Sequence, residues 1–200
     1  MRAGDRRHTV GRMTTNDLFS SPQPVTALAD LFASVWQLGY VCTDLDRGME
    51  FMRDQFGLEH CIEVPTDTAR VLDSGGEQVD WSARIAMGTR GGLIVELIEP
   101  VSGDVEFYRR LLPADGSFGV RLHHVATQIP VGDEEWERVR ELLAESGLRF
   151  DHTVLIPDRV RAGYVDTSAQ LGHLLEVCQL QPADIEMFTG IVRDSRPAAG

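Results

Sequence analysis

The feature that most constrains the fold of this chain is a unit of five elements that occurs twice. Apolar periodicity, helix-capping residues and glycine-containing turns predict a strand, a helix and three further strands in each half. In the first half these elements fall at residues 36–42, 43–57, 58–64, 81–88 and 92–99. In the second half they fall at residues 120–129, 133–147, 148–156, 161–167 and 172–180. We interpret this pattern as an internal repeat of one β-α-β-β-β module.

Each module ends in a glycine-led apolar run that holds a single glutamate. The run GGLIVELIEP spans 91–100 and contains Glu96, and the run LGHLLEVCQL spans 171–180 and contains Glu176. An ionised carboxylate is costly to bury unless it is paired or binds a metal. When the first strands are aligned as well, Gln37 matches His124. Each module therefore offers one ligand-capable side chain on its first strand and one on its last.

The repeat divides the 200 residues into five segments, which are predicted as follows. They are an N-terminal extension, partly disordered (1–34), a first βαβββ module (35–102), a connector (103–119), a second βαβββ module (120–181) and a C-terminal tail (182–200). The connector is expected to hold a short helix at 105–112 and the C-terminal tail another short helix, and the stretch 65–80 is predicted as a polar, glycine-containing loop. We expect the first thirty or so residues to contribute little to the folded body.

Composition excludes several classes of protein. The net charge of −12 disfavours binding to nucleic acid or to anionic membranes. No apolar run approaches the roughly 18 residues that cross a bilayer. Three widely spaced cysteines indicate neither a disulfide framework nor a zinc site of the CxxC type. The expected setting is the cytoplasm, and the expected partner is a small-molecule substrate.

Four motifs, in this order and spacing, resemble the vicinal oxygen chelate superfamily, which includes glyoxalase I, methylmalonyl-CoA epimerase and the bleomycin resistance proteins. They are QLGYVCTDLDRGMEFMRDQFG, LIVELIEP, HHVA and GHLLEV, and the resemblance covers about residues 35–180. It implies an α+β fold in which two paired βαβββ modules form a cupped mixed sheet. It also implies one divalent metal ion in the cup, bound by side chains from the first and last strand of each module.

Carried over position by position, the resemblance implies that Gln37, Glu96, His124 and Glu176 bind this metal. One imidazole, one amide oxygen and two carboxylates suit Zn, Co, Ni, Mn or Mg, whereas iron fits this set less well. In the glyoxalase-like mechanism, Glu96 and Glu176 are also the bases. His123 competes with His124 for the metal, but side chains alternate across a strand, so only one of the two is expected to face the cup.

Further polar residues are candidates for contact with substrate, namely His60, Tyr164 and Asp166. Each also has a structural interpretation, as a surface histidine, a core tyrosine and a loop-capping aspartate. His152 and His173 are open to the same two interpretations. The specificity of the cup is expected to come from residues 65–80 and 99–120.

The first hypothesis is a metal-dependent enzyme that transfers a proton on a hydrophobic carbonyl or acyl-thioester compound, as an isomerase, an epimerase or a glyoxalase-type lyase. The alternatives are an iron(II) ring-cleaving dioxygenase and a non-enzymatic small-molecule binder of the resistance type. Gln37 in place of a histidine disfavours the dioxygenase, which needs two histidines and one carboxylate. Four ligand-type residues disfavour the binder. Whether a homodimer forms around the cup stays open.

Overall fold

The computed structural model describes residues 22–90 and 92–194. Its strands are β1 (Val35–Cys42), β2 (Glu59–Val64), β3 (Arg70–Asp73), β4 (Gln78–Val79), β5 (Trp81–Arg90), β6 (Leu93–Gly103), β7 (Val120–Gln128), β8 (His152–Ile156), β9 (Val160–Val165) and β10 (Leu174–Leu180). Its helices are the 3-10 helix η1 (Leu28–Ser34) and the α-helices α2 (Leu45–Phe56), α3 (Glu106–Arg109), α4 (Asp133–Glu145), α5 (Ser168–Leu171) and α6 (Pro182–Asp194). Within the described residues, no helix is long and apolar enough to span a membrane.

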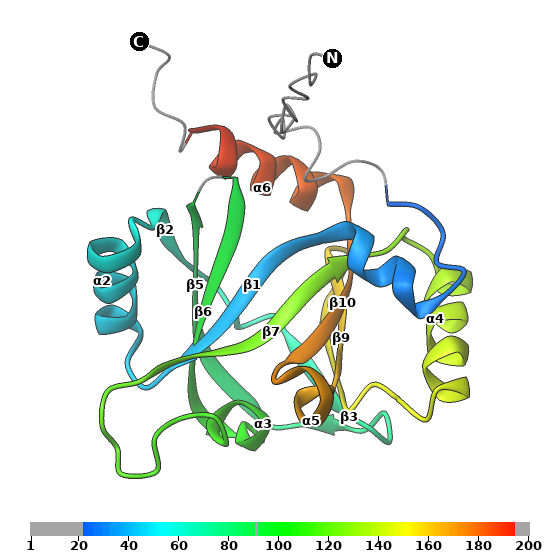
Figure 1. Ribbon diagram of the computed structural model, residues 1–200, viewed down its shortest axis with the longest axis horizontal. Coiled ribbons are helices and arrows are strands. Elements are labelled where there is room, and N and C mark those ends of the chain that lie inside the picture. The colour runs from blue at the N-terminus through cyan, green and yellow to red at the C-terminus, as the bar shows by residue number, and fades with distance from the viewer. Residues whose placement is uncertain (1–21, 91, 195–200) are drawn as a thin grey trace, which may run out of the picture.

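The ten strands form one mixed sheet in the order β2-β5-β6-β1-β7-β10-β9-β8-β3-β4. The first strands of the two modules, β1 and β7, pair antiparallel at its centre. Each also pairs in parallel with the last strand of its own module, β6 or β10. The sheet curls into a cup, with α2 and α4 on opposite sides and α6 across one end (Figure 1). The predicted α+β fold of two paired βαβββ modules is therefore confirmed.

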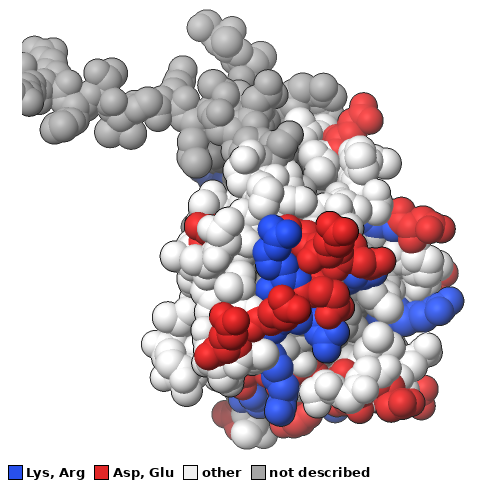
Figure 2. Space-filling view, turned by 90° about the vertical axis from the view of Figure 1, so that its right-hand side faces the viewer, with Lys and Arg blue, Asp and Glu red and all other residues white. Residues whose placement is uncertain are grey.

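Helices α2 and α4 follow the sequence signals closely. The side chain of Asp44 accepts a hydrogen bond from the backbone N–H of Arg47 and so caps α2, which ends at Gly57 in the left-handed conformation. Trp136, Val139 and Leu143 form the buried face of α4. The exposed side of the molecule around α4 carries acidic and basic side chains side by side (Figure 2).

The stretch 65–80 was predicted as a loop, and the structure corrects this prediction. It holds the short strands β3 and β4, which form a hairpin. β3 pairs antiparallel with β8 of the second module, so that a segment of the first module extends the sheet of the second. Strands of four and two residues are too short to show a periodicity in the sequence. The outer partner of β3 is β8, which lies about eighty residues away in the chain.

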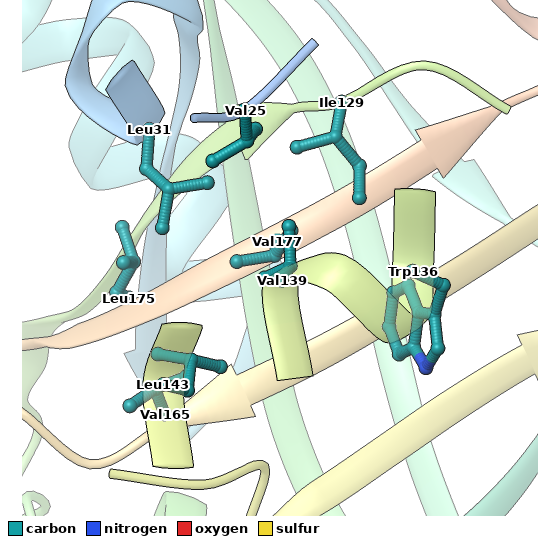
Figure 3. Packing of buried hydrophobic residues seen from close by; sticks show 9 residues of the cluster. All are labelled: Val25, Leu31, Ile129, Trp136, Val139, Leu143, Val165, Leu175 and Val177. Carbon is teal, nitrogen blue, oxygen red and sulfur yellow. The ribbon is translucent and has the colours of Figure 1, made fainter. Parts of the chain in front are cut away.

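The segment before β1 contributes more than the sequence suggested. Val25 and Leu31 are 2% and 1% exposed, and they pack against α4, β9 and β10 (Figure 3). The buried carboxylate of Glu135 accepts a hydrogen bond from the backbone N–H of Val25 at 2.5 Å. The hydroxyl of Thr127 donates to the backbone carbonyl of Leu31. The expectation that the first thirty residues contribute little is thus wrong for the part from Val25, and residues 1–21 lie outside the described residues.

Candidate metal centre

The strand register brings the two modules into equivalence at the predicted site. On β1 and β6, Gln37 lies opposite Ile94, two residues before Glu96. On β7 and β10, His124 lies opposite Leu174, again two residues before Glu176. Gln37 and His124 therefore occupy matching positions, and so do the two glutamates, as the alignment of the repeat predicted.

These four side chains are buried together in the cup. The exposed fractions are 2% for Gln37, 6% for Glu96, 0% for His124 and 6% for Glu176. The Nε2 atom of His124 lies 3.3 Å from Oε2 of Glu96 and 3.2 Å from Oε2 of Glu176. One imidazole nitrogen thus faces a carboxylate from each half of the molecule.

The charges of the three groups act strongly on one another. Burial alone would lower the pKa of His124, but the carboxylates of Glu176 and Glu96 raise it to about 10. Burial raises the pKa of Glu96. Burial also acts to raise the pKa of Glu176, but the charge of His124 and a hydrogen bond from Tyr164 overcome it, and the pKa is lowered. The site is therefore an electrostatic unit that favours a positive charge between two carboxylates.

The residues present fit a divalent ion by two observations. His124 Nε2 and Glu96 Oε2 are buried without a hydrogen-bond partner of good geometry, which is costly unless another group satisfies them. Two donors that each lie about 2.0–2.2 Å from one ion lie about 3.0–3.5 Å from each other. The measured separations of 3.2 and 3.3 Å fall in this range. Among the described residues, however, no group of three or more His, Cys, Asp and Glu side chains already surrounds a metal position.

Gly39 is a residue that sequence reasoning missed. It lies opposite His124 on β1, and a Cβ atom at this position would come within 1.9–2.4 Å of three ring atoms of that histidine. The absence of a side chain therefore makes room for the imidazole. A glycine inside an apolar strand is a known sign of such a close approach, and QLGYV contains that sign.

As expected, His124 and not His123 faces the glutamates, but a bulge rather than regular alternation separates the two rings. Gly39 pairs with His124, but Tyr40 pairs with Leu122, so His123 is the extra residue of a β-bulge. Its ring is fully buried, and its Nδ1 lies 2.9 Å from Nδ1 of His124. His123 does not line the cavity described next. It lies behind His124, against α3.

A cavity of about 170 Å³ opens over the glutamates. Gln37, Glu96 and Glu176 line it together with Tyr108 and Tyr164. Its other walls are mainly apolar and come from both modules, and they include Trp36, Trp81, Ile85, Met87, Val154, Ile156, Val160, Ala162, Cys178 and Leu180. Pro65, Thr66 and Ala69, from the stretch expected to set specificity, line it as well.

The C-terminal helix α6 closes one end of this cavity. A short helix was expected in this tail, but its packing over the cavity was not. Met187 and Phe188 line the cavity, and the ring centroid of Phe188 lies 5.1 Å from that of Trp36. Asp184 is 2% exposed and accepts a hydrogen bond from Arg159, whose Nε atom lies 2.9 Å away. The three-residue spacing of Ile185, Phe188 and Ile191 was the available signal for a packed helix in this tail.

The three further candidates for substrate contact have different locations. Tyr164 is 4% exposed, pairs with Glu176 across β9 and β10, and lines the cavity. His60 is exposed on β2 and does not line it. Asp166 also lies outside it, where it accepts hydrogen bonds from Ser168 and forms an ion pair with Arg110 at 2.9 Å. Asp166 thus has the loop-capping interactions of its structural interpretation.

Comparison with known proteins gives one kind of match. No known family profile and no curated protein sequence matches the chain. Among solved structures, the methylmalonyl-CoA epimerase from Mycobacterium tuberculosis is 17% identical, with a TM-score of 0.51 over 82% of this chain and 97% of that chain. A Streptomyces coelicolor methylmalonyl-CoA epimerase variant in complex with 2-nitronate-propionyl-CoA is 21% identical, with a TM-score of 0.45 over 73% and 96%. A methylmalonyl-CoA epimerase in complex with methylmalonyl-CoA is 22% identical, with a TM-score of 0.47 over 74% and 94%.

These identities are low, and they bear on the fold rather than on the reaction. The epimerase from M. tuberculosis matches over nearly its whole length, so the likeness extends over both modules and not over one alone. The resemblance inferred from the four sequence motifs is thereby confirmed at the level of architecture. The chain has the fold of the vicinal oxygen chelate superfamily.

Proposed function

We propose that this protein is a metal-dependent enzyme that transfers a proton at a carbon atom next to a carbonyl group. The reaction is an isomerisation or epimerisation, or a lyase reaction of the glyoxalase type. The observation that carries the proposal is the pair of equivalent buried glutamates, which face one imidazole nitrogen at 3.3 and 3.2 Å beneath an apolar cavity.

In this proposal Gln37, Glu96, His124 and Glu176 hold one divalent ion. The donor set suits zinc, cobalt, nickel, manganese or magnesium. Held by these residues, a divalent ion would supply Lewis acidity toward a substrate oxygen, which would make the neighbouring C–H bond more acidic. The two carboxylates balance the charge of the ion, so that its burial is not prohibitive.

The proton itself is moved by Glu96 or Glu176. Both carboxylates line the cavity, and they come from opposite halves of the cup. Burial raises the pKa of Glu96 and makes it a stronger base than a glutamate in water, whereas His124 lowers the pKa of Glu176 in the metal-free protein. With one glutamate from each module, a proton removed by one can be returned by the other, which is what inversion of a carbon centre requires.

The substrate that fits this cavity is a hydrophobic carbonyl compound or an acyl thioester. Aromatic and aliphatic side chains from both modules and from α6 form most of the wall. Besides the ion pair of Arg159 and Asp184 at the α6 end, its polar side chains include those around the two glutamates. Tyr164 and Tyr108 lie in this polar region, and we assign Tyr164 a substrate contact.

Elemental analysis of the purified protein tests the proposal. We expect about one zinc, cobalt, nickel or manganese ion per chain, or uptake of magnesium to that level. Stoichiometric iron would favour the ring-cleaving dioxygenase instead. A chain that takes up no divalent metal would contradict the proposal and favour a small-molecule binder.

A substitution assigns the metal to the site. His124→Ala should lower the metal content sharply while circular dichroism shows a retained fold. The matched control is His173→Ala, since His173 contacts the backbone carbonyl of Leu174 and does not line the cavity. Undiminished metal in the His124→Ala variant would defeat the assignment.

A further inference from the structure

Behind the candidate metal centre, a second histidine connects the imidazole of His124 to the main chain. The Nε2 atom of His123 lies 3.2 Å from the backbone carbonyl oxygen of Phe107 in α3. Its Nδ1 atom lies 2.9 Å from Nδ1 of His124. The bulge at His123 is what allows the rings of two consecutive residues to meet.

The carbonyl group sets the direction of this chain of hydrogen bonds. A carbonyl oxygen only accepts, so Nε2 of His123 carries a proton and donates a hydrogen bond to the carbonyl oxygen of Phe107. Between the two Nδ1 atoms, one must donate and the other must accept. If Nδ1 of His123 donated, its ring would be a cation at 0% exposure, and no carboxylate of residues 22–90 or 92–194 forms an ion pair with it, so this state is very costly. Nδ1 of His123 therefore accepts, and Nδ1 of His124 donates.

The surroundings of His123 hold it in this orientation. Its ring is enclosed by those of Tyr108, Phe107 and Tyr164, with centroids 4.8, 5.8 and 5.7 Å away. If the ring of His123 rotated about its Cβ–Cγ bond, Nε2 would move away from the carbonyl of Phe107, and both groups would be left buried without a hydrogen bond. The aromatic cage and the carbonyl together define one orientation.

We propose that His123 is a positioning residue, anchored by the main-chain carbonyl of Phe107, that fixes the proton of His124 on Nδ1 and so presents Nε2 as the metal-binding atom. The inference rests on the proposed metal centre and deepens it. A histidine that binds a metal through one nitrogen usually donates the other N–H to an acceptor that fixes its tautomer. Here the acceptor is a second imidazole, and the connector helix α3 becomes part of the support of the site.

Nitrogen-15 NMR of the imidazole side chains tests the hydrogen-bond polarity on the unmodified chain, first without metal. We expect His123 as the neutral form with its proton on Nε2, and a proton on Nδ1 of His124. A proton on Nδ1 of His123 would overturn the proposal. This outcome does not depend on metal, so it separates this inference from the proposed function.

Cobalt(II) binding to substituted chains tests the consequence. His123→Phe keeps an aromatic ring in the cage but removes both hydrogen bonds. We expect Co²⁺ affinity to fall by about 10–100-fold, as is usual when such a supporting partner is lost. His123→Asn places an acceptor oxygen near the original Nδ1 position and should recover much of the affinity, which a purely space-filling role would not predict.

The matched control is His152→Phe. His152 stacks on the Phe107 ring at 4.0 Å, as a neighbour of the same helix, but it does not contact His124. Its replacement should leave Co²⁺ affinity unchanged. If folded His123→Phe protein binds Co²⁺ as tightly as the parent, the positioning role is wrong. If the parent itself binds no Co²⁺, the metal centre fails and the NMR result alone decides the hydrogen-bond polarity.

Discussion

At the scale of single residues, Glu176 combines two roles that one substitution can separate. Glu176→Gln keeps the shape and an oxygen ligand but removes the basic carboxylate. We expect part of the metal to be retained, and turnover to fall by about 10²–10⁴-fold, the usual loss when a general base is removed. The measurement is the exchange of solvent deuterium into a panel of hydrophobic carbonyl compounds and acyl thioesters. Glu134→Gln, on the exposed side of α4, is the control.

The same experiment with Glu96→Gln completes this test. If both single variants keep full activity with metal bound, neither glutamate is the base. Tyr164, which also lines the cavity beside Glu176, would then be the next group to replace.

Gly39 provides a steric test of the site. Gly39→Ala would place a methyl group within 1.9–2.4 Å of the His124 ring, so the imidazole must move. We expect the free energy of unfolding to fall by about 1–3 kcal/mol or more, the usual cost of overpacking, together with weaker Co²⁺ binding. Urea denaturation and a Co²⁺ titration measure the two effects. Gly190→Ala is the control, since a Cβ atom there meets nothing within 4 Å. If Gly39→Ala kept the stability and Co²⁺ affinity of the parent, the imidazole of His124 would not depend on the space above Gly39.

The pH dependence of stability tests the electrostatics of the metal-free protein. The carboxylates raise the pKa of His124 to about 10, above the value of 6.5 for a free histidine. The charged form of His124 therefore stabilises the folded state. This contribution is complete below the unfolded-state pKa of 6.5 and is lost as the pH rises toward 10. The metal-free protein should therefore become less stable between about pH 7 and pH 8.5, a range below the usual cysteine pKa. His124→Gln should flatten this part of the profile, and a parent curve that is already flat would contradict the pairing.

Sequence patterns predict four side chains that the structure places at equivalent positions of the two modules, because each holds a position defined by the repeat. They do not locate Gly39 as the space for His124, since that contact is made across two strands from different modules. They select His124 over His123 correctly, but they do not reveal the bulge that brings the two rings into contact, because the alternation rule assumes a regular strand. The errors thus lie where tertiary contacts decide the local geometry.

At the scale of elements, the segment before β1 is part of the core. Leu31 on η1 is 1% exposed, whereas its neighbour Phe32 is 50% exposed. Leu31→Ala should lower the free energy of unfolding by about 2–5 kcal/mol, as is typical for a buried leucine, and Phe32→Ala should change it little. Urea denaturation of the two variants measures the difference. Equal effects of the two substitutions would show that η1 is not fixed against α4.

The elements that the sequence predicted well are those with long, regular signals. α2 and α4 have capping residues or an apolar face, and β6 and β10 are long apolar runs. η1, the β3–β4 hairpin and the packing of α6 were missed or undervalued. These short or terminal elements are ordered by contacts with distant parts of the sheet.

At the scale of the whole molecule, the two modules share one continuous sheet, and this joins the halves of the site. The central β1–β7 pairing places Gln37 and His124 on neighbouring strands. The parallel pairings with β6 and β10 then bring one glutamate in from each side. The cup is complete within one chain, and α6 covers one end of its cavity (Figure 1).

The central claim is that residues from both modules bind one divalent ion. X-ray absorption spectroscopy of the cobalt-loaded protein tests it most directly, because the scattering reports which atoms surround the ion. We expect a single imidazole nitrogen, with every other ligand an oxygen at about 2.0–2.2 Å. Sulfur in the first coordination sphere would point to Cys178, and a second imidazole to His123. Either result, or a parent protein that takes up no ion, would contradict the account.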